Sequence, residues 1–550
     1  MTTVPGRVEA AAGLAVAGAD LVPGAESVRA GLLADDVPRR LAAGDPTLWG
    51  EAAQAEARVR LGWLDTMRRS RDLLGQVAQL RAELADLDHV VLAGMGGSSL
   101  APEVICRTLD RPLTVLDTTD PHQIRAALAD RLTRTVVVVS SKSGTTVETD
   151  SQRRAYWQAL RESGLSDAEV GRRFVIVTDP GSPLATIGEQ MGAVVVLADP
   201  DVGGRYSALT AFGLVPAALA GVDVAELLDQ AESLAPSLAA EVDNPALALG
   251  AALGAAALGT AEPPRDKVAL VDDGTGITGL GDWAEQLLAE STGKQGRGIL
   301  PVVVEAPDAP GVTGPGVLTV TVGGVLAAGA VAGGGVRPDI SVNGPLGAQF
   351  LAWEYATAVA GRVLKIDPFN QPNVTESKQN TSAILAAGQA APAQSPAAVD
   401  GAIALYGSRA ATVEQALREL LDAAGAGGYL AVLAYLDRQG EAAAAQLRPL
   451  LAGVAAVPVT FGWGPRYLHS TGQYHKGGPQ DGAFLLITGA VTEDLPVPDQ
   501  PYTFGTLQAA QAAGDRQALT SRGRPVLWLH LRDRPAGLRQ LLAVAGGLRT

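Results

Sequence analysis

Short apolar runs alternate with longer amphipathic segments along most of the chain. Residues 50–88 are rich in charge and carry apolar positions at the spacing of amphipathic helices. Beyond them, β-branched runs that end in small or polar residues alternate with helical segments: VVLAGMGG, PLTVLDTTDP, TVVVVSSKSG, RFVIVTDPGS and GAVVVLADPD. This pattern predicts parallel strands with both faces covered by helices.

A second series of apolar runs follows an alanine-rich helical stretch over 209–259 and a pair of prolines, Pro263 and Pro264, that mark a boundary. The runs are VALVDD, PVVVEA, VLTVTVGG, YLAVLAYLD, VPVTFGWG, AFLLITG and VLWLHL. The sequence therefore predicts an α/β protein with two doubly wound parallel-sheet domains in tandem. The expected divisions are a helical N-terminal segment (1–88), a first domain (89–262) and a second domain with a C-terminal extension (263–550).

Composition narrows the partners of the protein. The chain has 550 residues and a formal net charge of −15, without a Lys/Arg run, so we expect no nucleic acid and no anionic membrane surface as partner. Its single Cys106 fits a reducing cytoplasm. The N-terminus lacks the leucine-rich centre of a signal peptide, and the uncharged stretch 316–336 is glycine-rich, which indicates strand, turn and helix rather than a membrane span.

The first strand-ending loop, AGMGGSSLAPE at 93–103, has the composition of an anion site. Its glycines allow close approach to the backbone, and N–H groups at the next helix start, with Ser98 and Ser99, can donate to phosphate oxygens. A P-loop would require a lysine after the glycines. A dinucleotide site would require a third glycine where Ser99 stands, although Asp117 suits the acidic position of that motif. A tight turn without ligand is the alternative for one such loop alone.

A second loop favours a ligand site over a tight turn without ligand. SSKSGTTVET follows four valines and gathers Ser141, Ser143 and Thr146 around the cation Lys142. Alone, such a loop could merely cap a helix, since Thr146 and Thr149 are ordinary cap residues. Two anion-suited loops on strands of one sheet favour a monophosphate ligand.

Three further segments carry candidate chemistry. After VGG, Arg205 is either a surface arginine paired with Asp201 or a guanidinium held beside oxyanions. Gln286 and Glu290 share a helix face with apolar residues, so the carboxylate is either an edge residue that reaches solvent or a base at a cleft. In KIDPFNQPNVTESK, Gln371 is predicted to follow a proline-broken strand end, and Lys378 lies on the next helix.

GMGGSS, SSKSGTTVET, VGGRYSALTAFGL, EQLLAESTGK and IDPFNQPNVTESK resemble, in this order, the motifs of the glucose-6-phosphate isomerase (phosphoglucose isomerase) family, which is built from two sugar-isomerase (SIS) domains. The resemblance spans about 91–378 and looks closest to the isomerase portion of fused transaldolase/glucose-6-phosphate isomerases, although the leading residues leave no room for a transaldolase domain. It implies a metal-independent aldose–ketose isomerase of glycolysis and gluconeogenesis that interconverts glucose 6-phosphate and fructose 6-phosphate through a cis-enediolate. It also implies no cofactor, and a homodimer.

Matched motif by motif, the resemblance assigns Glu290 as the base between C1 and C2, Arg205 as the group that stabilises the enediolate, and Lys378 as a participant in ring opening. It assigns substrate binding to Gly97, Ser98, Ser141, Lys142, Ser143, Thr146, Gly204, Gln286 and Gln371. Such a set can transfer a proton without a metal, and the chain shows neither HExxH nor a comparable ligand group.

The ring-opening histidine departs from the order usual in the family. Many bacterial relatives carry an LHSxGQ-like motif between the base and the final lysine, whereas YLHSTGQYHKGG here follows Lys378. No histidine lies between Glu290 and Lys378. His469 is therefore the best candidate, His475 is its rival, and a loop histidine bonded to backbone is the alternative for His469.

Other functions remain open at this point. A non-catalytic sugar-phosphate sensor could keep the phosphate loops but would not require Glu290, Gln371 and Lys378. An NAD-dependent oxidoreductase could use the first loop, but SSKSGTT would have no role in it. A bifunctional phosphoglucose/phosphomannose isomerase would show the same motifs, because spacing does not fix the contacts around C2.

Overall fold

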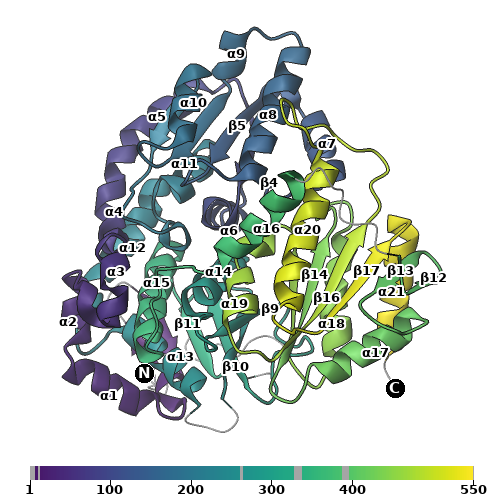
Figure 1. Ribbon diagram of the computed structural model, residues 1–550. Helices are drawn as coiled ribbons and strands as arrows, with labels where there is room; N and C mark the ends of the chain where they lie inside the picture. The colour runs from purple at the N-terminus through teal and green to yellow at the C-terminus, as the bar shows by residue number, and fades with distance from the viewer. Residues whose placement is uncertain (1–6, 10–12, 260–263, 327–336, 387–394, 549–550) are drawn as a thin grey trace.

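The computed structural model describes residues 7–9, 13–259, 264–326, 337–386 and 395–548, except the side chains of 374–378 and 386 (Figure 1). Its strands form three sheets, of which the first lies in the upper part of Figure 1, the second below it and the third on the right. The prediction of an α/β protein with parallel sheets is confirmed.

The first sheet contains the predicted strands and is parallel throughout, in the order β4-β3-β5-β6-β7. Its strands are β3 (His89–Gly94), β4 (Thr114–Leu116), β5 (Thr135–Ser140), β6 (Phe174–Thr178) and β7 (Val194–Leu197). Because β4 and β5 flank β3 on opposite sides, the chain reverses direction across the sheet between β3 and β5. Ligands of such sheets bind beyond the strand ends at this point, where the two hydroxyl-rich loops lie.

Helices separate and follow these strands along the chain, and the alanine-rich stretch forms the last three of them. They are α6 (Leu100–Thr108), α7 (Pro121–Ala129), α8 (Val147–Glu162), α9 (Asp167–Gly171), α10 (Pro183–Gln190), α11 (Ala211–Leu219), α12 (Val224–Leu238) and α13 (Pro245–Leu258). The connecting loops contain short 3₁₀ turns, η6 (Gly96–Ser98) after β3 and η8 (Gly204–Tyr206) after β7.

The second series of strands divides between two sheets, where the sequence predicted one domain. The second sheet has the order β1-β2-β11-β10-β8-β9 and contains β1 (Arg7–Glu9), β2 (Ala15–Ala17), β8 (Lys267–Asp272), β9 (Leu300–Val304), β10 (Val317–Gly323) and β11 (Ile340–Asn343). Its helices are α14 (Leu280–Thr292) and α15 (Leu346–Val363). The antiparallel hairpin β1–β2 completes its edge on β11, so the N-terminal segment is not purely helical. The rest of that segment forms α1 (Ala25–Ala34), α2 (Val37–Ala42), α3 (Gln54–Arg58), α4 (Thr66–Arg69) and α5 (Leu73–Glu83).

The third sheet accounts for the segment after residue 395. In the order β12-β13-β17-β16-β14-β15, it contains β12 (Ala398–Asp400), β13 (Ile403–Tyr406), β14 (Tyr429–Tyr435), β15 (Val459–Trp463), β16 (Gly482–Gly489) and β17 (Val526–Leu531). The helices of this part of the chain are α16 (Val374–Ala386), α17 (Val413–Ala423), α18 (Leu447–Ala452), α19 (Gly472–Gly477), α20 (Phe504–Thr520) and α21 (Arg534–Gly547), with the short turn η10 (Arg466–His469) after β15.

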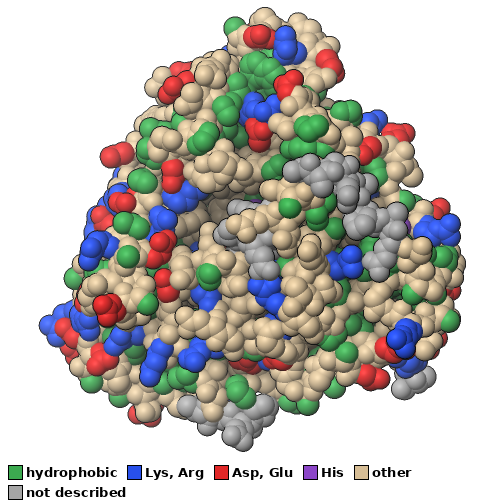
Figure 2. Space-filling view, in the orientation of Figure 1, with side chains coloured by type: hydrophobic (Ala, Val, Ile, Leu, Met, Phe, Trp, Pro, Cys, Tyr) green, Lys and Arg blue, Asp and Glu red, His purple; other side chains and the backbone are tan. Residues whose placement is uncertain are grey.

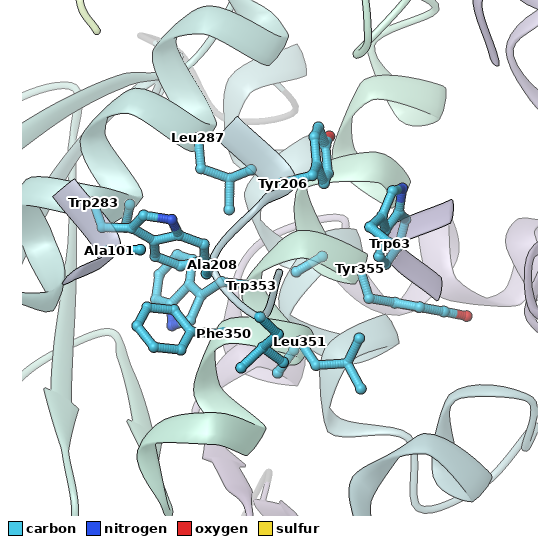
Figure 3. Packing of buried hydrophobic residues seen from close by; sticks show 14 of the residues in the cluster. Trp63, Ala101, Tyr206, Ala208, Trp283, Leu287, Phe350, Leu351, Trp353 and Tyr355 are labelled. Atoms are coloured by element: carbon cyan, nitrogen blue, oxygen red, sulfur yellow. The ribbon is translucent and has the colours of Figure 1, made fainter. Parts of the chain in front are cut away.

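One apolar core joins the N-terminal helices to the first two sheets (Figure 3). In it, Trp63 stacks on Tyr206, which follows the candidate Arg205, with ring centroids 5.4 Å apart. Trp283 of α14 packs edge-on against Phe350 of α15, with centroids 4.8 Å apart. Fully burying such rings stabilises by about 2–3 kcal/mol each. This core therefore fixes η8 and α14, the elements that carry Arg205 and Glu290.

Candidate active site

The glycine loop after β3 is the point at which segments from all three sheets meet. A Cβ atom on Gly97 would lie 1.9 Å from the carbonyl oxygen of Gly204. One on Gly96, whose φ is +56°, would lie 2.8 Å from Nε2 of Gln286 and 2.9 Å from the carbonyl oxygen of His469. Only glycine fits at both positions. The loop therefore has small residues because η8, α14 and η10 contact it.

Arg205 is 4% exposed and points into this junction. Its Nη1 lies 3.2 Å from Oε2 of Glu290 and donates to Oε1 of Gln371 over 3.2 Å. Its Nη2 is within 2.6–3.1 Å of the carbonyl oxygens of 368–370. The planar guanidinium thus positions the carboxylate and the loop of Gln371 together.

The alternative that Arg205 pairs with Asp201 at the surface is wrong. Asp201 instead lies 3.4 Å from Arg69, and its side chain is 54% exposed. The segment 364–373 before α16 is also coil that follows helix α15, where a strand end was predicted. Leu364 is the C-cap of α15, and both it and Ile366 are buried, so this stretch ends a buried helix.

Glu290 lies in the last turn of α14, is 5% exposed and uses one carboxylate oxygen for both of its contacts. Oε2 lies 3.2 Å from Arg205 and accepts from Nε2 of Gln286 over 3.1 Å. Within the described part of the chain, Oε1 has no hydrogen-bond partner. Glu290 is thus a buried carboxylate at a junction, not an edge residue that reaches solvent.

Three buried polar atoms beside this carboxylate have no partner among the described residues: Nε of Arg205, Oε1 of Gln286 and Oδ1 of Asn370. Buried polar atoms are normally hydrogen-bonded, and leaving one unsatisfied costs about 1–3 kcal/mol. One donor and two acceptors around a carboxylate suit a hydroxyl-rich ligand.

Lys294 is a buried cation of the site that the sequence did not single out. Its Nζ donates to the carbonyl oxygens of Asp367 and Asn370, each over 2.5 Å. Burial and the neighbouring Arg205 hold the pKa of its ammonium well below the usual range. Lys294 and Arg205 therefore hold the same loop from two elements.

His469 faces the second phosphate loop. Its Nε2 lies 3.1 Å from Oε1 of Glu148, which is in the first turn of α8 and accepts from Nε2 of Gln511 over 2.7 Å. A cavity of about 140 Å³ is lined by this histidine together with Thr146 and Thr381. Glu148 and Gln511 were not predicted, because nothing in the sequence pairs positions so far apart.

His475, the rival of His469, belongs to the core. Its Nδ1 lies 3.0 Å from the hydroxyl of Tyr429, and its ring stacks on that tyrosine with centroids 5.7 Å apart. Burial, with Lys476 and Arg524 nearby, holds its pKa well below the usual range. His475 therefore packs as a neutral side chain within the third sheet's unit.

The second loop forms a hydroxyl cluster. Oγ of Ser141 lies 3.0 Å from Oγ1 of Thr146 and accepts from the N–H of Gly144 over 3.2 Å. Ser143 bonds Thr145 over 3.0 Å. Ser98 is 8% exposed in η6. These hydroxyls and the N-terminus of α8 can together receive a phosphate.

Lys142, expected beside this phosphate, has another partner. Its Nζ donates to Oδ2 of Asp179 over 2.6 Å and lies near the carbonyl oxygens of 199–200. Its charge is therefore already paired with a carboxylate. Lys378 lies on helix α16, and its side chain is outside the described residues.

Gln473 links the histidine motif to the loop of Gln371. Its Nε2 donates to the carbonyl oxygen of Gly293 and to Oδ1 of Asn373, and its Oε1 accepts from the N–H of Asn373. The LHSTGQ stretch thus contacts both the end of α14 and the start of α16, although it follows them in the chain.

Acidic and basic side chains are interspersed on the face shown in Figure 2, which is hollowed near its centre. Among the described residues, no three His, Cys, Asp or Glu side chains are grouped in a way that could hold a metal ion. No described helix has the length and apolar character that a membrane span requires.

Comparison with known proteins identifies the class. Residues 64–256 match the family model of phosphoglucose isomerase. The glucose-6-phosphate isomerase of Rubrobacter xylanophilus is 32% identical over an alignment of 361 positions, which covers 54% of this chain and 82% of that protein. The chain therefore belongs to the glucose-6-phosphate isomerase family.

Other relatives are matched over a smaller part. The probable glucose-6-phosphate isomerase of Haloarcula marismortui is 36% identical over 228 residues, 40% of this chain and 50% of that protein. The chain thus spans about half the length of several curated relatives that it matches. A glucose-6-phosphate isomerase structure from Chlamydia trachomatis shares the fold, with a TM-score of 0.53, 17% identity and coverage of 70% of this chain and 90% of that one.

Proposed function

We propose that this chain is a glucose-6-phosphate isomerase, which interconverts glucose 6-phosphate and fructose 6-phosphate. The observation that carries the proposal is the buried pair of Glu290 and Arg205, at the junction that also holds the hydroxyl loops. A proton moves between C1 and C2 when one carboxylate lies over the enediolate and a cation lies near its oxygens. Family membership supports the same reaction.

In the proposed reaction, the phosphate occupies the hydroxyls of Ser141 and Thr146, with Ser98 opposite. His469 protonates the ring oxygen while the C1 hydroxyl passes its proton to solvent, and the sugar opens to the aldehyde. Glu290 then removes the C2 proton through Oε1, and Arg205 stabilises the enediolate oxygens. The protonated Glu290 returns the proton to C1 while the hydroxyl proton of the enediolate moves from O2 to O1, and the ketose forms, so no external electron donor is needed.

The direct test is incubation of the full chain with fructose 6-phosphate in D₂O, with the hexose phosphates identified by NMR. We expect glucose 6-phosphate that carries deuterium at C2. Formation of mannose 6-phosphate as well would extend the substrate range to both epimers. Absence of any aldose product would refute the proposal. We further propose a cytoplasmic homodimer, on the single cysteine and the family resemblance.

Removing a phosphate-loop hydroxyl should weaken substrate binding more than it slows turnover. We expect Ser141→Ala and Thr146→Ala each to raise KM by about 10–150-fold, because a hydrogen bond to a charged group contributes about 1.5–3 kcal/mol. The change in kcat should be smaller, since ground and transition states hold the phosphate alike. Steady-state kinetics measures both. Ser166→Ala, which removes a cap of α9 in the same unit, is the control that should leave KM unchanged.

His469→Ala should separate ring opening from proton transfer. We expect isomerisation of cyclic glucose 6-phosphate to fall by about 10²-fold or more, because a positioned acid–base group contributes about that factor. An aldose phosphate that cannot close a ring should be affected far less. The control is His122→Ala, on α7, which contacts Thr492 and Arg534 instead. Equal losses on both substrates would remove His469 from ring opening.

A further inference from the structure

Residues of helix α20 and of the third sheet line a separate cavity of about 130 Å³. It is lined from the carboxyl ends of three parallel strands, by Tyr435 of β14, Thr488 of β16 and His530 of β17. β15 lies beyond β14 and β17 beyond β16, so the strand order reverses between β14 and β16. Open α/β sheets bind ligands at such a point.

The cavity is open because α20 presents small residues to the strands. Gly505, Ala509, Ala512 and Ala513 line it at the spacing of one helix face. The opposite wall contains large apolar groups, among them Trp528. An apolar cavity of about 150 Å³ can hold one benzene ring, so the space suits a single six-membered ring.

Arg516 continues the same helix face and supplies a charge without a counterion. Its guanidinium lies 5.1 Å from the ring centroid of Trp528. Within the described part of the chain it has neither a hydrogen bond nor an ion pair. Burial lowers its pKa, which shows that its charge is partly desolvated. By contrast, Arg438, similarly covered, is paired with Glu103 over 3.0 Å.

Several other polar groups of the cavity have partners within the chain. Thr488 lies 2.9 Å from Nδ1 of His530 and accepts from Nε1 of Trp528 over 2.8 Å. Gln508 donates to Asp120 of the first unit over 3.2 Å. Arg516 is thus the point at which a ligand would find an unpaired charge, and the charge that it requires is negative.

We propose that this cavity binds a small aromatic carboxylate, with the ring against Trp528 and Tyr435 and the carboxylate on Arg516. The guanidinium then gains the anion that the chain does not provide, and the ring fills the space left by the alanines. The site uses none of the residues of the proposed isomerase reaction, so the two proposals can fail separately.

The test uses benzoate as the probe, titrated into the full chain and followed by the NMR signal of the Trp528 indole, assigned with Trp528→Phe. We expect saturable binding with a Kd on the order of 1 mM or tighter. Benzamide, which has the same shape without charge, should bind at least tenfold more weakly. Arg516→Met should weaken benzoate by at least tenfold and leave benzamide unchanged. Arg532→Met, an exposed arginine that follows β17, is the matched control.

Ala512→Leu provides a second variant that keeps Arg516 and fills the cavity, and it should block both probes. Saturating inorganic phosphate should not displace benzoate. The proposal is overturned by absence of saturable benzoate binding, by unchanged affinity in Arg516→Met, by equal affinity for benzamide, or by competition with phosphate, which would locate benzoate in the phosphate loops.

Discussion

Glu290→Gln should reduce isomerisation by about 10²–10⁴-fold or more while the substrate remains bound. The amide oxygen can still accept from Arg205 and Gln286, so the side chain should keep its place. It cannot take the C2 proton, and that step should stop. The measurement is incorporation of solvent deuterium at C2 of glucose 6-phosphate, together with KM and with binding of a phosphate-containing inhibitor.

The control for this variant is Glu354→Gln, on α15. Glu354 is also buried, and burial holds its pKa well above the usual range, which favours the uncharged carboxyl. Glu354→Gln should therefore leave turnover nearly unchanged. Deuterium incorporation at the wild-type rate in Glu290→Gln would show that another group is the base.

Arg205→Lys should lower kcat/KM by about 10²–10³-fold, although the charge is retained. The guanidinium contacts Glu290, Gln371 and three carbonyl oxygens at once, which a lysine ammonium cannot reproduce. Loss of one preorganised donor to a developing oxyanion costs about 10²–10³ in kcat. Arg205→Met, which also removes the charge, should lose more.

Stability must be measured beside activity for these variants, because breaking one side of a buried ion pair costs about 3–5 kcal/mol. Urea unfolding of each variant measures this loss of stability. Arg297→Lys is the matched control, since Arg297 is exposed and its guanidinium, among the described residues, donates to the carbonyl oxygen of Leu364 alone. If Arg205→Lys kept full kcat in its folded fraction, Arg205 would be a structural residue only.

The strands of the first sheet and the loops after them could be predicted from the sequence. β-branched runs such as Thr135–Ser140 end abruptly in glycine and hydroxyl residues. Continuous apolar runs of this kind are typical of buried parallel strands. The third sheet could not be separated from the second, since an apolar run is compatible with either. Short strands such as β2 (Ala15–Ala17) and β11 (Ile340–Asn343) carry too few residues for a period to show.

Only part of the candidate site could be predicted from the sequence. Arg205, Gln286, Glu290 and Gln371 lie in recognisable motifs, and the structure brings them together. Lys294, Glu148 and Gln473 were missed because their roles depend on partners that are distant in the chain. His469 and Glu148 are separated by 321 positions yet lie 3.1 Å apart. Local spacing contains no information on such a pair.

Two neighbouring glycines allow distant parts of the chain to pack closely against each other. At Gly96 and Gly97, the gap between polypeptide segments is narrower than one methyl group. The separation of Glu290 from His469 therefore depends on more than these two side chains. It also depends on how closely the segments that carry them can approach the backbone of the glycine loop. A single side-chain carbon at either position would therefore push apart segments that are far apart in the sequence.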